Sequence, residues 1–463
     1  MASLISGTRE NLPSNDIKEI LDDPFGVNTI INNNPHLNPN RSTAHWFFKE
    51  YFHKIPLLFQ KIVSPIESLY YSSALAKITT HILLLYFLSF FILKARPKFN
   101  FELVIISLLL TPFFQAFGYH NYLGIIDTSI TYTFFYAIPL MFLLFFYSFI
   151  YRTIISKQKA KLTFFSKTIV TLLVISLPFS GAIIPPVILI VSGLIAIYYY
   201  RVNETHPYNL SFKSIKNTLN NIPTNIKVIL ISISVLSLYS LFLGTYNAGY
   251  QSGNISIIDR YARLPTGIYY QFTQKLAFPA LFLYIAINLV IIKKYYYTEK
   301  GRKIISSSKW ILIFSLIYLI LMPLGGFREY RENILRYDSI MPITIGLIYL
   351  YGASSFYLLK SIKRKKTQYA VFLIAFFLIF TNADRSELNN SNNEKLALKE
   401  IQNSEKEIVV LKNNCSVLAW GTLYTPNESS TNADMMVKWN ITSKRTLYYF
   451  DSTKTSITPH KPF

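Results

Sequence analysis

The sequence predicts a mainly α-helical protein that crosses a membrane about ten times and carries a polar segment at each end. Three observations lead to this fold class. The 463-residue chain is 51% hydrophobic and 16% aromatic, and its mean hydropathy is positive, which is more apolar than soluble domains are. The apolar residues gather in ten stretches. The loops between these stretches alternate between strongly basic and less basic ones.

The ten apolar stretches predict membrane-spanning helices. Several are shorter than the ~20 residues that cross the hydrocarbon core, so flanking residues must contribute. The run LPFSGAIIPP (177–186) holds three prolines and a glycine, which predicts a tight hairpin. One kinked helix over 168–200 is the alternative, but it is too long for one crossing. The expected spans are 74–94, 101–117, 129–151, 168–180, 182–200, 228–244, 276–292, 310–325, 338–359 and 370–381.

Five loops carry almost all of the net charge of +22. They hold 23 Lys and Arg residues but only two acids, and they lie within 94–98, 152–167, 201–227, 293–309 and 360–366. Basic loops of this kind stay in the cytoplasm when a chain inserts into a membrane. Membrane insertion therefore explains the net positive charge, and the expected partners are membrane lipids. Binding to nucleic acid is not needed to explain this charge.

This topology divides the chain into three parts. Residues 1–73 form an extracytoplasmic segment, 74–381 the transmembrane domain and 382–463 an extracytoplasmic appendage. A polar segment of this length needs a preceding signal to cross the membrane, so we expect a first helix upstream of the sequence. The expected location is a bacterial inner (plasma) membrane.

Both end segments contain recognisable elements. The run AHWFFKEYFHKIPLLFQ within 1–73 is typical of an amphipathic helix, lying either on the membrane surface or packed in a soluble cap. In the appendage, EIVVLK, SVLAWGTLY and RTLYYFD look like short strands of a small α/β unit. The single cysteine, Cys415, excludes an internal disulfide, and no Cys/His cluster has metal-ligand spacing.

Carboxylates on the non-basic side are the first candidates for chemistry. SNDIKEILDD places Asp16, Asp22 and Asp23 on one or two helical turns, where one could act as a general base. An N-capped surface helix explains the same residues. Between two spans, GYHNYLGIIDTS holds His120 and Asp127, and Asp127 could equally cap the next helix.

Arginines on that side are the second group, because they depart from the charge sorting. FREYRENILRYDSIMP (327–342) contains three of them beside Tyr337, and guanidinium groups bind phosphate with two hydrogen bonds. Alternating Arg and Glu at 328–332 could instead neutralise each other. The loop 245–275 adds Arg260 among many tyrosines. The expected binding residues are Arg328, Arg331, Arg336, Tyr337, His120 and Arg260.

The order of these segments resembles the GT-C superfamily of polytopic glycosyltransferases, which use lipid-phosphate-linked sugars. The resemblance covers most of 1–381. SNDIKEILDD followed by HWFFKEYFHKIPLLFQ is similar to the acidic motif and juxtamembrane helix of that family's first outer loop. LPFSGAIIPPVILIV resembles the tight hairpin of that family. Arg336 and Tyr337 resemble the Arg-Tyr pair that precedes one of the family's late spans. The family's adjacent acidic pair is absent at Asp16, where Ile17 follows.

The resemblance implies transfer of a sugar from a polyprenyl-phosphate-linked donor to a hydroxyl of a glycan or lipid acceptor. A carboxylate among Asp16, Asp22 and Asp23 would deprotonate the acceptor, and Asp127 would orient it. Arg336, with Arg328 or Arg331, would hold the phosphate. No cofactor is certain, and a divalent cation is an option. The polyprenyl chain would lie between aromatic-rich helices.

Two other readings compete with this one. An O-antigen-type polysaccharide polymerase or ligase would rely on the arginine-bearing loops 245–275 and 326–337, and its N-terminal carboxylates would be dispensable. A lipid or solute transporter is disfavoured, because the spans carry few charges at their centres and no internal repeat is visible.

Overall fold

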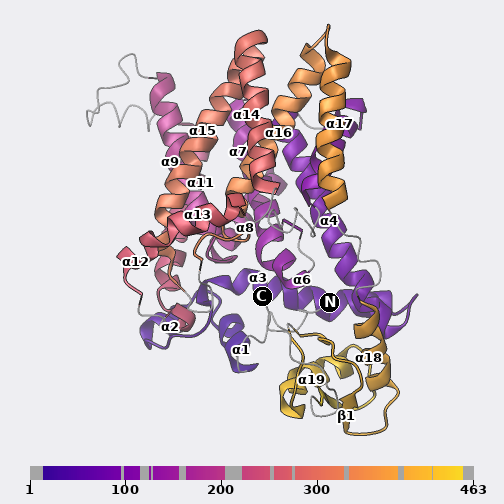
Figure 1. The fold of residues 1–463 in the computed structure, drawn as a ribbon. Helices are drawn as coiled ribbons and strands as arrows, with labels where there is room; N and C mark the ends of the chain where they lie inside the picture. The colour runs from indigo at the N-terminus through magenta and orange to yellow at the C-terminus, as the bar shows by residue number, and fades with distance from the viewer. Residues whose placement is uncertain are drawn as a thin grey trace.

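The computed structural model describes residues 14–94, 99–114, 125–126, 129–155, 163–203, 222–250, 255–273, 277–327, 333–383, 391–419 and 421–451. The protein is mainly helical, and its long helices form a bundle with smaller elements gathered at one end (Figure 1). The long helices are α4 (Pro65–Leu93), α7 (Ile138–Ile155), α9 (Ile184–Asn203), α11 (Thr224–Gly244), α14 (Ala277–Tyr295), α15 (Glu299–Leu321), α16 (Met341–Ser361) and α17 (Lys366–Ala383).

Shorter elements connect or extend these helices. Those of the N-terminal half are α1 (Ser14–Asp22), α2 (Val27–Ile31), η1 (Pro39–Arg41), α3 (Ser42–Phe59), α5 (Phe101–Leu110), η2 (Thr111–Phe114), α6 (Ile130–Tyr132), a π-helical turn (Thr133–Ala137), α8 (Phe164–Ser176) and η5 (Leu177–Phe179). Those that follow α11 are η6 (Ala248–Tyr250), α12 (Ile257–Ala262), α13 (Leu264–Thr273), η7 (Met322–Gly325), α18 (Asn392–Gln402), β1 (Ile408–Leu411), η8 (Pro426–Ser429), α19 (Ser430–Lys438) and β2 (Leu447–Phe450).

Seven helices of the described chain are long and apolar enough to cross a membrane. They contain α4, α6 with α7, α9, α11, α14, α15 and α16. Three shorter apolar helices, 101–114, 164–179 and 366–378, coincide with the other three expected spans. These seven helices support an integral membrane protein. The total of ten crossings remains a prediction, because the shorter three fall below the usual spanning length.

The helices differ in how much of their surface the protein covers. The apolar windows of α16 and of α6–α7 are 78% and 72% buried, so these helices form the centre of the bundle. The window of α15 is only 6% buried, so this helix lies at the edge. A buried polar cluster links three helices, where Asn288 of α14 donates to Ser354 and Ser355 of α16 and accepts the Tyr369 hydroxyl of α17.

The expected hairpin is confirmed. Helix α8 ends in η5, Gly181 has a φ of 122°, and α9 begins three residues later. A φ of this size is unfavourable for any residue with a Cβ, which explains a glycine between the two helices.

Described residues of three basic loops, 94–98, 293–309 and 360–366, lie at one end of the bundle. Lys360, at the end of α16, pairs with Glu102 at the start of α5. Lys94 follows α4, and both burial and the nearby charge of Lys303 lower its pKa, while Glu299 opposes them. Helices α1, α2, α3 and α12 lie at the opposite end, where α3 runs across the bundle (Figure 1).

The amphipathic segment forms α3, which packs on α4 and buries Phe48 and Phe52. Trp46 and Leu58 on the same helix are exposed. Helix α4 begins at Pro65, where Ser64 accepts a hydrogen bond from the backbone of Glu67. It starts earlier than the expected span, so the expected boundary at 73 falls within it.

The C-terminal appendage is a small α/β unit, and its strands β1 and β2 pair in parallel. Both lie where strands were expected. The third expected strand, SVLAWGTLY, is wrong for the residues described there, because 417–419 form a bend. Buried Glu394 accepts the backbone N–H of Leu418, which has a φ of 51°, and this fixes a conformation that strands do not adopt.

Candidate functional site

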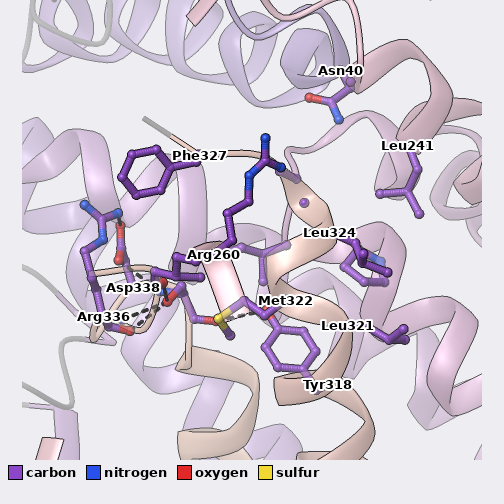
Figure 2. Close-up of a pocket in the computed structure, with 18 of the residues that line it drawn as sticks. Asn40, Leu241, Arg260, Tyr318, Leu321, Met322, Leu324, Phe327, Arg336 and Asp338 are labelled. Carbon is purple, nitrogen blue, oxygen red and sulfur yellow. Dashed lines mark hydrogen bonds and ion pairs between the residues drawn. The ribbon is translucent and has the colours of Figure 1, made fainter. Parts of the chain in front are cut away.

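A cavity of about 600 Å³ lies at the end of the bundle opposite the basic loops. Its walls come from η1, the start of α9, the end of α11, α12, the end of α15 with η7, and the segment 333–339. Figure 2 shows Arg336 with Asp338 at one side of this cavity and Leu241, Leu321 and Leu324 at the other, with Arg260 between them. The cavity therefore has a charged side and an apolar side.

Arg41 enters the cavity from the N-terminal segment. It ends η1, where Asn40 donates to the Ser240 carbonyl of α11 and so ties the turn to the bundle. Its guanidinium carbon lies 5.0 Å from the centre of the Phe135 ring. A Cβ on Gly181 would lie 3.2 Å from Arg41 Nε, so the hairpin glycine makes room for this side chain. Arg41 Nε is buried and has no hydrogen-bond partner among the described residues.

Arg336 and Asp338 form an ion pair within the cavity. Arg336 Nη2 lies 2.5 Å from Asp338 Oδ2, and the Asp338 carboxylate is buried. Asp338 Oδ1 accepts the backbone N–H of Ser339 at 2.9 Å. The hydroxyl of Tyr318 donates to the Ser339 carbonyl, which joins this turn to α15. Because Arg336 is about one-quarter exposed, it can still donate to a ligand.

Arg260 reaches the cavity from α12, a six-residue helix that Ser256 caps through the backbone N–H of Asp259. Its Nε donates to the Ile255 carbonyl at 3.2 Å, which holds the base of the guanidinium. With Arg41 and Arg336, it gives the cavity three arginines against one carboxylate among the lining residues described. That excess of positive charge suits an anion.

His45 lies behind Arg41, one turn into α3. It is fully buried, and its ring packs 4.7 Å from that of Phe135. Burial and the neighbouring charge of Arg41 lower its pKa to about 3. His45 is therefore neutral near neutral pH, and the positive charge in this region belongs to Arg41.

Neither Asp22 nor Asp23 lines this cavity. Asp23 accepts three hydrogen bonds, from the backbone N–H of Val27 and from both the N–H and the hydroxyl of Thr29. These contacts cap the short helix α2. Asp22 is exposed at the end of α1. Asp16 lies in the first turn of the same helix, and its side chain is outside the described part.

The remaining predicted residues divide into two groups. His120, Asp127, Arg328 and Arg331 lie outside the described residues. Tyr337 is described, and its ring lies 5.9 Å from that of Tyr132, but it does not line the cavity. Of the ten predicted site residues, the structure thus brings Arg260 and Arg336 together.

The sequence reasoning missed Arg41 and Asp338 as cavity residues. Arg41 lies outside the five basic loops, so the criterion that selected Arg336 would also have selected it. Among the described residues, no group of three or more His, Cys, Asp or Glu side chains could hold a metal ion. Asp338 is the one carboxylate among the cavity-lining residues described.

The arrangement can bind an anionic group beside an apolar one. The arginines supply hydrogen-bond donors for phosphate oxygens, and the leucines of α11, α15 and η7 supply a surface for hydrocarbon. No protein-family model, curated protein or solved structure matches the chain.

Proposed function

We propose that the protein is a membrane glycosyltransferase that moves a sugar from a polyprenyl-phosphate-linked donor to an acceptor hydroxyl. The observation that supports this most is the meeting of Arg41, Arg260 and Arg336 at one cavity with an apolar side. A lipid phosphate matches these two sides, because it has an anionic head for the arginines and a hydrocarbon chain for the apolar side. We infer that the cavity lies on the extracytoplasmic side, because basic loops usually stay in the cytoplasm and their described parts lie at the other end of the bundle.

The proposed chemistry is displacement at the anomeric carbon of the donor sugar. The acceptor oxygen forms the new bond, the bond to the phosphate oxygen breaks, and the acceptor proton passes to a base. The phosphate leaves with an added negative charge, which Arg41, Arg260 and Arg336 stabilise because they are already in place.

The base is assigned to a carboxylate. Asp338 lines the cavity, where it is paired with Arg336. Asp16, Asp22 and Asp127 stay candidates from the sequence, whereas the capping contacts of Asp23 favour a structural role for that residue.

An O-antigen-type polymerase or ligase is the second candidate. One observation favours it: Arg260 and Arg336 come from the two loops that such an enzyme would use, and Asp22 and Asp23 lie away from the cavity. Both candidates use the same lipid-linked donor. They differ in whether the N-terminal carboxylates matter.

The test is glycan transfer in membranes that contain the protein. Arg260→Gln should lower transfer by about 10²-fold, the size of losing one preorganised donor. Arg263→Gln is the matched control, because Arg263 lies on the same segment over Phe327 and does not line the cavity. Equal activity of Arg260→Gln and wild type would contradict the proposal.

A second set of variants separates the two candidates. Asp16→Ala, and Asp22→Ala with Asp23→Ala, should abolish transfer if an N-terminal carboxylate is the base. Full activity in both would favour the polymerase or ligase, whereas loss in Asp338→Asn would identify Asp338 as the base under either candidate. Transport of an unaltered substrate by purified protein in sealed vesicles would overturn both.

A further inference from the structure

Helices α12 and α13 carry apolar side chains on their outer surface. Ile258 of α12 is 80% exposed and Tyr269 of α13 is 62% exposed, and Ile257, Ile268 and Phe272 are exposed as well. On α13, the spacings of three and four residues place Ile268, Tyr269 and Phe272 on one face. Apolar side chains gathered in this way mark an interaction surface.

The inner sides of the same two helices are used by the protein itself. Arg260 lines the cavity, and Arg263 lies over the ring of Phe327. Gly267 of α13 is buried, and a Cβ on it would lie 2.7 Å from the side chain of Leu335. The two helices therefore pack with one side and leave the apolar side to a partner.

The position of α12 and α13 indicates where this partner lies. Helix α12 packs on η7, which follows α15, and α13 packs on α14. The Tyr261 hydroxyl of α12 donates to the Ile320 carbonyl in the last turn of α15 at 2.8 Å. Helix α13 runs across the long helices instead of along them (Figure 1). Both helices thus lie at the level where membrane-spanning helices leave the hydrocarbon.

The exposed face of α13 continues into the exposed face of a spanning helix. The Phe272 ring lies 5.5 Å from that of Phe278 and 6.2 Å from that of Phe282, both on α14. Phe282 is exposed, and α14 is long and apolar enough to cross a membrane. Ile320 is likewise exposed on α15, whose apolar window is almost entirely uncovered by protein. Lipid that surrounds α14 and α15 therefore also reaches α12 and α13.

Polar groups limit how deeply these helices can lie. Asp259 is exposed next to Ile258, and its carboxylate accepts the Ser256 hydroxyl at 2.7 Å. A carboxylate is costly in the hydrocarbon core. Tyrosine, by contrast, is enriched where the headgroups begin. The mixture of Ile258, Asp259 and Tyr269 therefore fits the bilayer interface and does not fit its centre.

We propose that residues 257–273 form a membrane-surface element whose exposed isoleucines and aromatic rings insert into the leaflet at the cavity end of the bundle. The partner is the lipid surface, and the apolar face reaches about 5–10 Å into the boundary between headgroups and acyl chains. This inference goes beyond the proposed function, because it assigns a binding surface outside the cavity. Insertion of Ile257 and Ile258 also holds their short helix, and with it Arg260, at the level of the headgroups.

Spin labels measure this depth directly. Full-length Cys415→Ser protein in nanodiscs carries one nitroxide label, at Ile258→Cys or at Tyr269→Cys. Collisions of the label with oxygen, which concentrates in lipid, are compared with collisions with a water-soluble nickel chelate. Leu283→Cys on the exposed face of α14 is the lipid control, and Lys412→Cys in the appendage is the water control.

Labels at Ile258 and Tyr269 should collide more with oxygen than with the chelate, as at Leu283, with a depth of about 5–10 Å. Accessibility like that at Lys412 would overturn the proposal. Low access to both reagents would overturn it as well, because another protein or a second copy of the chain would then cover the surface.

A charge substitution tests whether apolar insertion is the cause. With the label at Ile257→Cys, the added change Ile258→Asp should shift the label toward the chelate, because a second carboxylate resists insertion. Ile258→Leu is the matched control and should keep the label in lipid. Ile258 is exposed, so neither change removes a core contact. An unchanged label in Ile258→Asp would contradict insertion of this face.

The label measurement does not depend on glycan transfer, so the two proposals fail separately. A protein without transfer activity whose labels lie in lipid would contradict the enzyme and support the membrane-surface element. An active enzyme whose labels are accessible like Lys412 would contradict the membrane-surface element alone.

Discussion

Arg41 shows how a single residue can depend on three distant parts of the chain. The turn η1 presents it, Phe135 and Tyr136 lie beneath its guanidinium, and Gly181 leaves the space for it. A guanidinium on an aromatic face keeps its outer hydrogens free for a ligand.

Arg41→Lys should lower transfer by about 10²-fold, nearly as much as Arg41→Gln, because lysine provides no planar fork of donors. The measurement is kcat/KM in nanodiscs, with thermal unfolding as a check of folding. Lys49→Gln on the exposed face of α3 is the control. Wild-type kcat/KM in Arg41→Lys would mean that charge alone suffices and that no planar contact with phosphate exists.

The buried His45 predicts a pH dependence of stability. Its pKa in the folded protein, about 3, is below the ordinary value of 6.5. The unfolded chain therefore binds a proton that the folded protein does not between these pH values. Stability is fully present above about pH 6.5 and falls at lower pH by up to ~1.4 kcal/mol per pH unit. Denaturation measured from pH 7 to pH 4 should show a smaller slope for His45→Phe, and an unchanged slope would refute this assignment.

Asp23 tests a structural reading against a catalytic one. Asp23→Ala removes the acceptor for three donors and should cost about 1 kcal/mol of stability, the usual value of a helix cap. Asp23→Asn keeps one acceptor oxygen and should lose less. Chemical denaturation measures both variants. Near-complete loss of transfer in a stably folded Asp23→Asn would instead identify it as the base.

At the scale of elements, close helix contacts depend on small residues. A Cβ on Gly352 of α16 would lie 2.7 Å from Leu110 and 2.8 Å from Ile92. These are contacts that side chains cannot keep, so α5 and α4 must approach α16 at a glycine. The sequence shows a glycine here but gives no sign of which helices meet it.

Gly352→Leu should destabilise the protein by about 1–3 kcal/mol, the typical cost of overpacking. Thermal unfolding in detergent measures the effect. Gly193→Leu is the comparison, because it places the same side chain where the structure has open space. Equal melting temperatures for the two variants would contradict the packing of α16 against α4 and α5.

At the scale of the molecule, α3 connects the cavity to the appendage. It begins next to Arg41, and its 18 residues cover about 27 Å. Near its far end, Trp439 of the appendage donates its indole N–H to the Phe52 carbonyl at 2.8 Å, and Gln60 donates to the Trp439 carbonyl. The ion pair of Lys395 with Glu67 adds a contact to α4.

Trp439→Ala should release the appendage from the bundle, because losing a buried indole costs about 3–5 kcal/mol. Hydrogen exchange should rise in 391–451 and stay unchanged in α16. Lys438→Ala is the control, since the Lys438 amine makes only an exposed contact with His53. Unchanged exchange in Trp439→Ala would mean that other contacts hold the appendage in place.

The sequence by itself determined what depends on local composition. Apolar length predicted helices at all ten expected positions, Pro and Gly predicted the turn at Gly181, and runs of β-branched and aromatic residues predicted β1 and β2. Local pattern was wrong at SVLAWGTLY, where a contact from distant Glu394 decides the conformation. The charge sorting also selected Arg336 as an exception, and the tyrosine-rich loop 245–275 pointed to Arg260.

Only the tertiary structure decided which of these residues meet. Arg41, Arg260 and Arg336 lie far apart in the sequence and line one cavity because α9, α11 and α15 bring their ends together. Asp22 and Asp23 looked equally suited to the site, but the turn before α2 uses Asp23 as a cap. Residue type follows from sequence, whereas distance between side chains follows from helix packing, which no local pattern encodes.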